Sequence, residues 1–219
     1  MVNAEMLLFR ESNRHGPYLY YHLLSGVDLP IKTQDYIHAF MDMHKGKLFI
    51  GYSPNNEHLQ RHIKRCVGRY WVMDRWARTD NLFMYRARKL VNKLVGFIPR
   101  KLQEDFRKGT NWVSVTEDCV RFLLENEGLI RRRFNHSHLV DEIFLHTIVY
   151  ANLSLRKCLF CPESEFKGCM REIDWSRGHP YTWTFADKEL LNRSDALFAR
   201  KFSEEDLDIV YWIRDRFSQ

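Results

Sequence analysis

The 219-residue chain lacks any long run of uncharged apolar residues, and its mean hydropathy is −0.46. A helix that crosses a bilayer needs about 20 consecutive apolar residues, so the sequence argues against a membrane-spanning protein. The first residues, MVNAEMLLFRESNRHG, have no basic start, no apolar stretch and no small-residue cleavage site of a secretory signal. Together these absences predict a cytoplasmic protein.

Cysteine is scarce, with five residues in the chain. An odd number favours free thiols in a reducing compartment over a disulfide framework. Cys158, Cys161 and Cys169, with His179 as a fourth candidate, contain one close C-x2-C pair. Structural zinc usually takes two such pairs, so the spacing disfavours a zinc site.

Several sequence signatures of common enzyme classes are missing. The chain has no Walker-type or dinucleotide-type glycine loop and no Gly-x-Ser-x-Gly elbow. It also has no internal repeat, no low-complexity tract and no Gly/Ser-rich linker. With 45% hydrophobic residues, residues 1–219 are long enough to bury a core, and we expect them to form one domain.

Basic residues are in excess. The formal net charge is +6 and the sequence pI is about 9.1. This balance suits an anionic partner, which could be nucleic acid, an acidic membrane surface or a phosphorylated small molecule. The net charge does not choose among them.

The hydrophobic pattern mixes the two periodicities of helices and strands and predicts an α/β fold. The run over residues 18–26 is nearly continuous, as in a buried parallel strand. A helix is expected after Thr33, which can act as its N-cap. The other expected helices cover residues 3–12, 82–95, 117–126, 137–153, 187–194 and 203–217, and the other expected strands cover residues 46–52, 63–76, 111–115 and 171–175.

The end of the first expected strand is the first candidate site. Open α/β sheets bind ligands beyond the carboxyl ends of their strands, and LLSGVDLP lies at such an end. Gly26 would let a ligand approach the backbone closely, and Asp28 would accept a hydrogen bond from a ligand hydroxyl. The alternative is an ordinary turn, in which the glycine permits a tight bend and Asp28 is a local cap.

A carboxylate at Glu142 is the second candidate. On a helix over 137–153, His138 and His146 would lie one turn before and one turn after Glu142. A carboxylate between two imidazoles could act as a general base. The alternative is that Asp141 and Glu142 only favour the positive end of the helix dipole.

Two cations form the third candidate. Arg200 and Lys201 lie between Phe198 and Phe202, just before the last expected helix. Fixed cations of this kind could hold a diphosphate, whereas the alternative is a solvated basic turn.

The expected helix over 82–95 is basic and amphipathic. Phe83, Ala87, Leu90, Val91 and Leu94 form one stripe, with arginines and lysines outside it. We expect this stripe to pack in the core and the cations to face solvent, although contact with a membrane or with nucleic acid is an alternative.

Five segments in order resemble one family: YYHLLSGVDLPIKT, KGTNWVSVTEDCVRFLLENEGLI, VDEIFLHTIV, REIDWSRGHP and LFARKF. The pattern is similar to that of the core-2/I-branching β-1,6-N-acetylglucosaminyltransferases, and peptide O-xylosyltransferases share it. The resemblance runs from about the first residue to about Phe202. Its specificity comes from the order and spacing of all five segments.

The resemblance implies a GT-A type fold and an inverting, metal-independent glycosyltransferase that uses a UDP-sugar as co-substrate. By matching motifs, Glu142 would be the catalytic base. The diphosphate would be held by Lys201 and by the adjacent Arg200. The remaining matches are Ser25, Gly26 and Asp28 on the donor side, Arg177 (one position out of register) as a further donor ligand, and Trp175 on the acceptor sugar.

The resemblance also carries departures from the family pattern. Family members usually have further strands and helices before the segment that matches NAEMLLFRES, so residues 1–219 would correspond to about the C-terminal two-thirds of the family's domain. Val140 stands where a proline is usual. The donor sugar stays open between N-acetylglucosamine, the first candidate, and xylose, because much of the nucleotide-base site would lie outside this sequence.

Two further expectations concern partners and a competing function. We expect a glycan or glycoconjugate acceptor, a peripheral contact with an anionic membrane at its inner face, and no nucleic acid. The competing function is a non-catalytic saccharide-binding module, in which Trp112 and Trp175 would hold the sugar.

Overall fold

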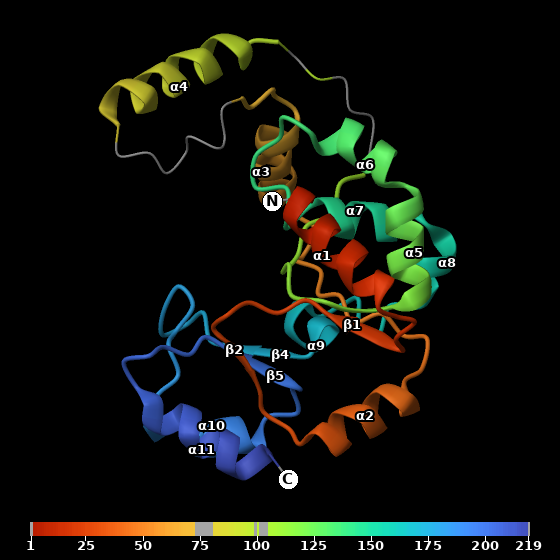
Figure 1. Ribbon diagram of the computed structural model, residues 1–219. Coiled ribbons are helices and arrows are strands. Elements are labelled where there is room, and N and C mark those ends of the chain that lie inside the picture. The colour runs from red at the N-terminus through yellow and green to blue at the C-terminus, as the bar shows by residue number, and fades with distance from the viewer. Residues whose placement is uncertain (1, 73–80, 99, 101–104, 219) are drawn as a thin grey trace. The chain divides into compact units, whose positions relative to one another are not determined.

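The computed structural model describes residues 2–72, 81–98, 100 and 105–218 (Figure 1). The chain divides into two compact units, each built from segments that are far apart in the sequence. The first, which we call the helical unit, combines residues 1–16, 53–109 and 118–156. The second, which we call the sheet unit, combines residues 17–52, 110–117 and 157–219.

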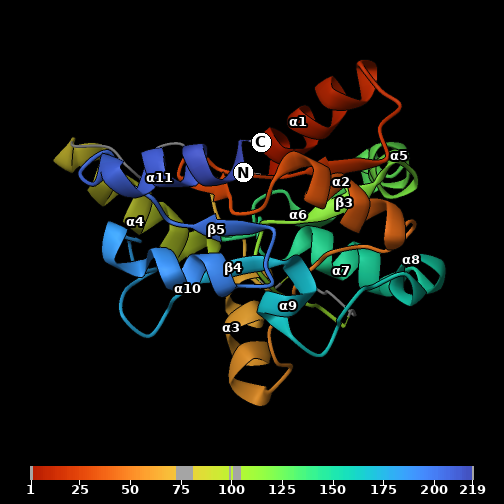
Figure 2. The same ribbon diagram turned by 90° about the horizontal axis from the view of Figure 1, so that it is seen from below.

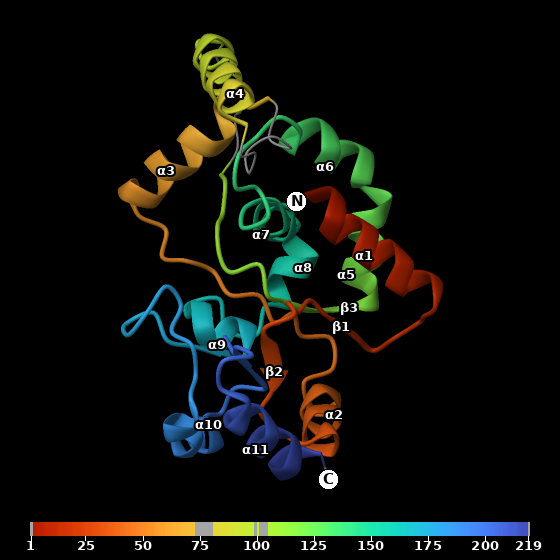
Figure 3. The ribbon, with the colours of Figure 1, turned by 60° about the vertical axis from the view of Figure 1, so that its left-hand side comes forward.

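The helical unit is held together by contacts between its N-terminal helix and the helices of its C-terminal segment (Figure 3). Arg10 of α1 (Val2–Arg14) and Glu127 of α6 (Glu127–Phe134) form an ion pair that joins these two helices. The rings of Phe106, Phe134 and Phe144 follow one another in edge-on contact through the core. The helices are α1 (Val2–Arg14), α3 (Glu57–Val67), α4 (Leu82–Val95), α5 (Glu117–Glu125), α6 (Glu127–Phe134), α7 (Phe144–Ala151) and α8 (Leu153–Lys157).

The sheet unit contains two small sheets. One pairs β1 with β3 in antiparallel register, with Tyr21 opposite Val115. The other has the order β2-β5-β4, in which β5 is antiparallel to β2 and parallel to β4. Its elements are β1 (Tyr20–His22), β2 (Asp28–Pro30), α2 (Gln34–Met43), β3 (Ser114–Thr116), α9 (Glu165–Cys169), β4 (Arg171–Ile173), η2 (Phe185–Asp187), α10 (Lys188–Arg193), β5 (Phe198–Arg200) and α11 (Leu207–Phe217).

The three-stranded sheet separates two cores, because neighbouring residues of a strand point to opposite faces. Phe198 packs with Ile37 and Met41 of α2. Its neighbour Ala199 belongs to a second core that α10 and α11 cover. Figure 2 shows β4 and β5 alongside each other, with these two helices near them. This second core comprises Ile31, Trp183, Leu191, Ala196, Ala199, Phe202, Ile209 and Ile213.

Most of the expected elements are confirmed. The mixed α/β class is confirmed and is consistent with a GT-A-like arrangement. The helix over 82–95 is found with the same bounds as α4. Thr33 caps α2 by accepting a hydrogen bond from the Tyr36 N–H at 3.2 Å. The expected helices over 3–12, 117–126, 187–194 and 203–217 and the strand over 171–175 overlap α1, α5, α10, α11 and β4.

Five expected elements need correction. The strand predicted over 63–76 is wrong, because residues 57–67 form the helix α3. The buried residues Ile63, Cys66 and Val67 follow helical spacing. Residues 73–76 of the predicted strand lie outside the described residues. The stretch over 46–52 pairs only through single bridges of Leu48 and Phe49. Strand pairing within 18–26 is limited to β1 and is antiparallel, and the strand expected over 111–115 is found at 114–116.

The fifth correction concerns the helix predicted over 137–153. Its helical part begins only at Phe144. Leu139 has φ of 48°, and the Val140 carbonyl accepts hydrogen bonds from both Ile143 and Phe144 in a turn. Glu142 therefore lies in a turn before α7. Among the described residues, no helix is both long enough and apolar enough to cross a membrane.

Candidate functional site

The candidate donor residues gather at one edge of the three-stranded sheet. Arg200, at the end of β5, is the register partner of Asp28 on β2 and of Ile173 on β4. Because β4 and β5 are parallel, the residues that follow them emerge at the same edge. Lys201 follows β5 and Trp175 follows β4, and the Ser25–Gly26 turn precedes β2 at this edge.

Asp28 is the anchor of this edge. Its side chain is 1% exposed, and its oxygens accept hydrogen bonds from the Ser25 N–H at 2.7 Å, from the Ser25 hydroxyl at 3.0 Å and from Arg200 at 2.7 Å. A carboxylate that is buried and satisfied in this way is not open to a ligand hydroxyl. The structure therefore replaces the expected hydroxyl-acceptor role of Asp28 with a positioning role toward Arg200.

The guanidinium of Arg200 is held on three sides. It donates to the Ser25 hydroxyl at 2.6 Å in addition to its bond with Asp28. Its carbon lies 4.0 Å from the ring centre of Trp112, which gives a cation–π contact. The turn of β2, the end of β5 and the KGTNW segment thus meet at Arg200. The guanidinium of Arg200 therefore covers one ring face of Trp112.

Gly26 lies in a turn that the Asp28 N–H closes by donating to the Ser25 carbonyl at 3.1 Å. A Cβ atom added at Gly26 would meet nothing within 4 Å. The packing of the chain therefore does not require glycine at this position, and the space over its backbone is open.

Lys201 has a fixed backbone and an uncommitted side chain. Its N–H donates to the Tyr181 carbonyl at 3.4 Å, and its carbonyl accepts from the Trp183 N–H at 2.9 Å. Within residues 2–72, 81–98, 100 and 105–218, its ammonium has no ion-pair partner. The side chain of Lys201 therefore starts from a fixed backbone and carries a positive charge that the described residues do not neutralise.

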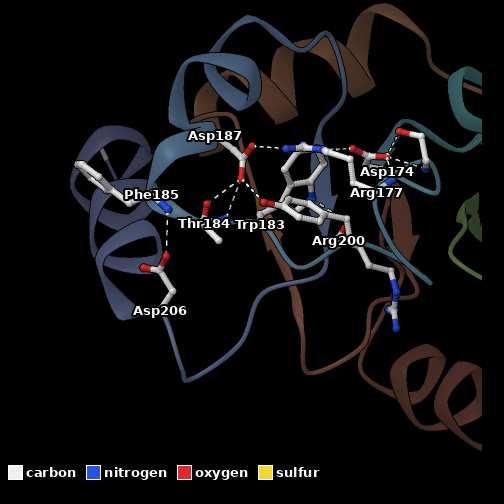
Figure 4. Close-up of polar contacts among 10 residues, drawn as sticks. Asp174, Arg177, Trp183, Thr184, Phe185, Asp187, Arg200 and Asp206 are labelled. Carbon is white, nitrogen blue, oxygen red and sulfur yellow. Dashed lines mark hydrogen bonds and ion pairs between the residues drawn. The ribbon is translucent and has the colours of Figure 1, made fainter.

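Trp183 is a residue that the sequence reasoning missed. Its indole N–H donates to the Arg200 carbonyl at 2.7 Å, and its side chain is fully buried (Figure 4). Trp183 therefore fixes the backbone between Arg200 and Lys201 from the buried side. Its position one residue before the threonine cap offered no signal for this role.

Arg177 is already engaged by the protein. Its guanidinium bonds the carboxylates of Asp174 and Asp187, the latter at 2.7 Å, and lies 3.9 Å from the ring centre of Tyr181 (Figure 4). These hydrogen bonds hold the pKa of Asp174 well below its usual range and that of Arg177 above it. Arg177 therefore fastens the loop after β4, and the same loop carries Trp175, which is 45% exposed.

Asp187 completes this loop. Thr184, at the start of η2, donates to it from its N–H at 3.0 Å and from its hydroxyl at 2.9 Å. Burial works to raise the pKa of Asp187, but the hydrogen bonds from Arg177, Thr184 and Tyr181 outweigh it and lower that pKa. The loop is therefore held by ion pairs and hydrogen bonds among its own residues.

Glu142 belongs to the helical unit. Its carboxylate forms an ion pair with the Lys108 ammonium at 2.8 Å, and its carbonyl accepts from the Gly109 N–H at 3.0 Å. The expected helical row with His138 and His146 is wrong, because Glu142 precedes the helix: His138 stacks on Trp71 at 4.7 Å, and His146 is fully buried.

Lys108, which the sequence reasoning did not single out, leads a small group of titratable side chains. His62 on α3 lies close enough that burial, with the Lys108 charge, lowers its pKa. Cys66 Sγ lies 3.6 Å from His62 Nε2, and burial raises the pKa of this thiol. Little in the sequence indicated this role, since Lys108 is an ordinary lysine next to Gly109.

A buried polar network lies within the sheet unit. His22 Nδ1 is 2.7 Å from the Ser114 hydroxyl, which also accepts from Arg171 at 3.2 Å. Burial, together with the Arg171 charge, lowers the pKa of His22 to about 4. Burial also lowers the pKa of Arg171 to about 10. The guanidinium lies 4.3 Å from the ring centre of Phe198, so this network ties β1, β3 and β4 to β5.

Cys158, Cys161, Cys169 and His179 are the candidate metal ligands in the sequence. No disulfide links the five cysteines among the described residues, and Cys161 donates to Glu163 at 3.0 Å. In the part of the chain that the structure describes, no three His, Cys, Asp or Glu side chains are grouped as metal ligands would be. That part includes Cys158, Cys161, Cys169 and His179.

Comparison with known proteins supplies the family. A family model described as Core-2/I-Branching enzyme matches residues 1–197, which is most of the chain. A search of curated proteins found no match. The matched residues include the turn before β2, the KGTNW segment, Glu142 and Trp175. The chain therefore belongs to the Core-2/I-branching enzyme family.

Proposed function

We propose that this member of a glycosyltransferase family is an inverting, metal-independent enzyme that transfers a sugar from a UDP-sugar to a glycan hydroxyl. N-acetylglucosamine is the first candidate for the sugar, and xylose is the second. The observation that carries the proposal is the assembly of Arg200 and Lys201 at the edge of the three-stranded sheet. The proposed place of action is the cytoplasm, at the inner face of the membrane.

The proposed diphosphate site uses cations whose positions are set before the ligand arrives. Departure of UDP develops negative charge on the β-phosphate, and fixed cations can stabilise that charge. Asp28, Ser25 and Trp112 hold the guanidinium of Arg200, and Trp183 holds the backbone beside it. Lys201 would supply a charge that no described carboxylate neutralises, and the open space at Gly26 would admit the donor.

The proposed general base is Glu142. In an inverting displacement, the acceptor oxygen forms a bond to the anomeric carbon while the bond from that carbon to the UDP oxygen breaks. The proton of the acceptor hydroxyl passes to Glu142, and the bonding electrons leave with UDP. The Lys108 ammonium at 2.8 Å supports this role, because it orients the carboxylate before the reaction.

The proposed acceptor contact is Trp175. Its side chain is 45% exposed and lies on a loop that Arg177, Asp174 and Asp187 fasten. An exposed indole on a rigid loop suits stacking against a sugar ring. Trp112 is assigned instead to Arg200, and Arg177 to the loop.

The proposal is tested with three variants and two measurements. Calorimetry measures UDP binding, and transfer is measured from radiolabelled UDP-N-acetylglucosamine and UDP-xylose, with and without a chelator. We expect Glu142→Gln to bind UDP normally but to lose transfer by at least about a hundredfold, since a general base contributes that much. We expect Lys201→Ala to weaken UDP binding by about tenfold or more, since a charge-assisted hydrogen bond is lost.

Matched controls separate these effects from general loss of structure. Glu125→Gln, at an exposed position of the helical unit, and Lys157→Ala, at an exposed position of α8, should leave both measurements unchanged. Full transfer by Glu142→Gln would refute the assignment of the base, and loss of activity on chelation would refute metal independence. Glycan binding without any UDP binding would favour a non-catalytic saccharide-binding protein.

A further inference from the structure

Helix α4 exposes the apolar stripe that was expected to lie in the core. Phe83 is 76% exposed, Leu90 is 59% exposed and Leu94 is 61% exposed. Phe97, just beyond the helix, is 76% exposed and continues the stripe. No residue of α4 is buried. The expectation of core packing for this stripe is therefore wrong.

The exposed stripe and the side of α4 that contacts the protein lie on different parts of the helix circumference. Residues 83, 90 and 94 share one face, because their spacing of seven and four residues returns to the same side. Val91 and Val95 are partly buried, and Asn92 accepts a hydrogen bond from the Val72 N–H at 2.8 Å. The helix is thus attached through its Asn92 side, and the stripe of Phe83, Leu90 and Leu94 faces outward.

Cations line one border of the same outward side. Arg86, Lys89 and Lys93 are all exposed and fall next to the stripe on the helical wheel. The segment from Asn81 to Ile98 contains no aspartate or glutamate. None of these three cations forms an ion pair with a carboxylate of the described residues. The outward side therefore combines positive charge that no described carboxylate neutralises with aliphatic and aromatic surface.

We infer that the outward side of α4 binds the surface of an anionic lipid bilayer, with the helix lying in the plane of the headgroups. A helix in that position buries its apolar side at the boundary of the acyl chains while Lys and Arg contact the anionic headgroups. The inference is independent of the proposed transferase activity. It would place the protein beside lipid-linked molecules in the same headgroup layer.

The chemistry favours a bilayer over the other anionic partner considered, nucleic acid. Phosphodiester backbones and base edges would engage the cations but leave Leu90 and Leu94 in water. Only a partner that presents negative charge next to hydrocarbon satisfies both parts of the outward side. Anionic phospholipid has this combination.

The experiment is co-sedimentation of the full chain with vesicles. One set contains phosphatidylcholine alone, and the other contains roughly 30% phosphatidylglycerol, a fraction at which anionic headgroups attract basic segments. We expect binding to the anionic vesicles and a loss of at least about tenfold for Lys89→Glu combined with Lys93→Glu. Leu90→Ser combined with Leu94→Ser keeps the net charge, and we expect it to lose about tenfold or more, because less apolar surface enters the bilayer.

Two control variants make each result decisive. Lys45→Glu combined with Lys157→Glu changes the net charge equally at exposed positions elsewhere, and Leu153→Ser removes an exposed leucine from α8. Both controls should bind vesicles like the parent chain, and circular dichroism should report the same helix content for all variants. Equal losses in the controls and in the α4 variants would overturn the inference. So would tighter binding of the parent chain to RNA or duplex DNA than to anionic vesicles at physiological salt.

Discussion

Asp28 and Arg200 are 172 positions apart in the sequence and form an ion pair of 2.7 Å across the paired strands β2 and β5. The carboxylate is almost fully buried, whereas the guanidinium keeps partial contact with solvent. The pair thus connects the interior of the sheet unit to the edge at which we propose that the donor binds. Ser25 and Trp112 complete the support of Arg200, so the position of this cation depends on three separate chain segments.

Replacing Asp28 by asparagine should destabilise the protein through Arg200. The variant keeps the shape of the side chain but removes the charge that compensates the guanidinium. Removing one partner of a buried pair costs about 3–5 kcal/mol, and the retained amide oxygen reduces this, so we expect a loss of about 2–3 kcal/mol. Urea unfolding measures the change.

The control for Asp28 is Asp215→Asn, which breaks an exposed ion pair with Arg214. Exposed pairs contribute about 0–1 kcal/mol, so its effect should be small. Equal effects of the two substitutions would show that the Asp28 pair is energetically an ordinary surface pair.

Replacing Lys108 by methionine should slow sugar transfer. The proposed base Glu142 would lose the ammonium 2.8 Å away that orients it. We expect the turnover number to fall by about 10–100-fold, in line with the cost of misplacing a catalytic group, while UDP affinity stays unchanged. Lys108→Arg should recover part of the rate because it restores the cation.

The matched control for Lys108 is Lys64→Met on α3, which removes an exposed lysine from the same unit. It should keep the parent turnover number. A Lys108→Met enzyme with normal turnover, in a preparation whose Glu142→Gln variant is inactive, would show that the ion pair does not position the base.

Replacing Glu5 by glutamine should stabilise the protein at neutral and higher pH. Burial, followed by the charge of Asp141, raises the pKa of Glu5 from 4.5 to about 8. The folded state therefore keeps a proton that the unfolded chain releases, and the free energy of unfolding falls as the pH rises from 4.5 toward 8. Glutamine removes this penalty, and we expect a gain of about 2–4 kcal/mol at pH 8.

The gain from Glu5→Gln should disappear near pH 4, where the glutamate is protonated in both states. Urea unfolding at the two pH values measures both results, with Glu125→Gln as an exposed control. A stability difference that does not change with pH would contradict the assigned protonation state of Glu5.

Replacing His22 by glutamine should remove part of the acid sensitivity of the sheet unit. The pKa of His22 is lowered from 6.5 to about 4, so the imidazole stays neutral in the folded state. The contribution of His22 to the free energy of unfolding is fully present above pH 6.5. It is lost as the pH falls from 6.5 toward 4, because the unfolded chain takes up a proton at a higher pH than the folded chain does. The parent chain should lose about 1–2 kcal/mol through His22 between pH 7.5 and 5.

The measurement for His22 is the difference in unfolding free energy between pH 7.5 and pH 5 for the parent chain, for His22→Gln and for the exposed control His15→Gln. The parent and the control should show the same loss, and His22→Gln should show a smaller one. An identical loss in all three chains would refute the titration of His22 as its cause.

Local sequence was sufficient for elements whose ends and faces depend on nearby residues. Thr33 predicted the start of α2 because its hydroxyl satisfies an N–H of the same helix. Helical periodicity predicted α4 with its observed bounds. It could not predict whether the stripe on α4 would be covered, because covering it requires an apolar surface from elsewhere in the chain.

Local sequence failed where distant partners determine the conformation. Residues 63–67 alternate enough to suggest a strand, yet their buried side chains follow the helical turn of α3. Glu142 was expected within a helix beside His138 and His146, but the turn at Leu139 delays the helix, and Lys108 is the partner of the carboxylate instead. Neither the helical conformation of residues 63–67 nor the pairing of Glu142 with Lys108 can be predicted from the neighbouring residues alone.

By itself the sequence determined the mixed α/β class, the family and the identities of the charged residues that surround the proposed donor site. Those properties follow from composition, periodicity and the order of motifs, all of which are local or linear. Only the tertiary structure decided what each charge does: Asp28 is buried against Arg200, Arg177 is bound to Asp174 and Asp187, and Lys201 has no ion-pair partner among the described residues. The reason is that a side chain's role depends on burial and on hydrogen-bond partners, and strand pairing brings those partners together from opposite ends of the chain.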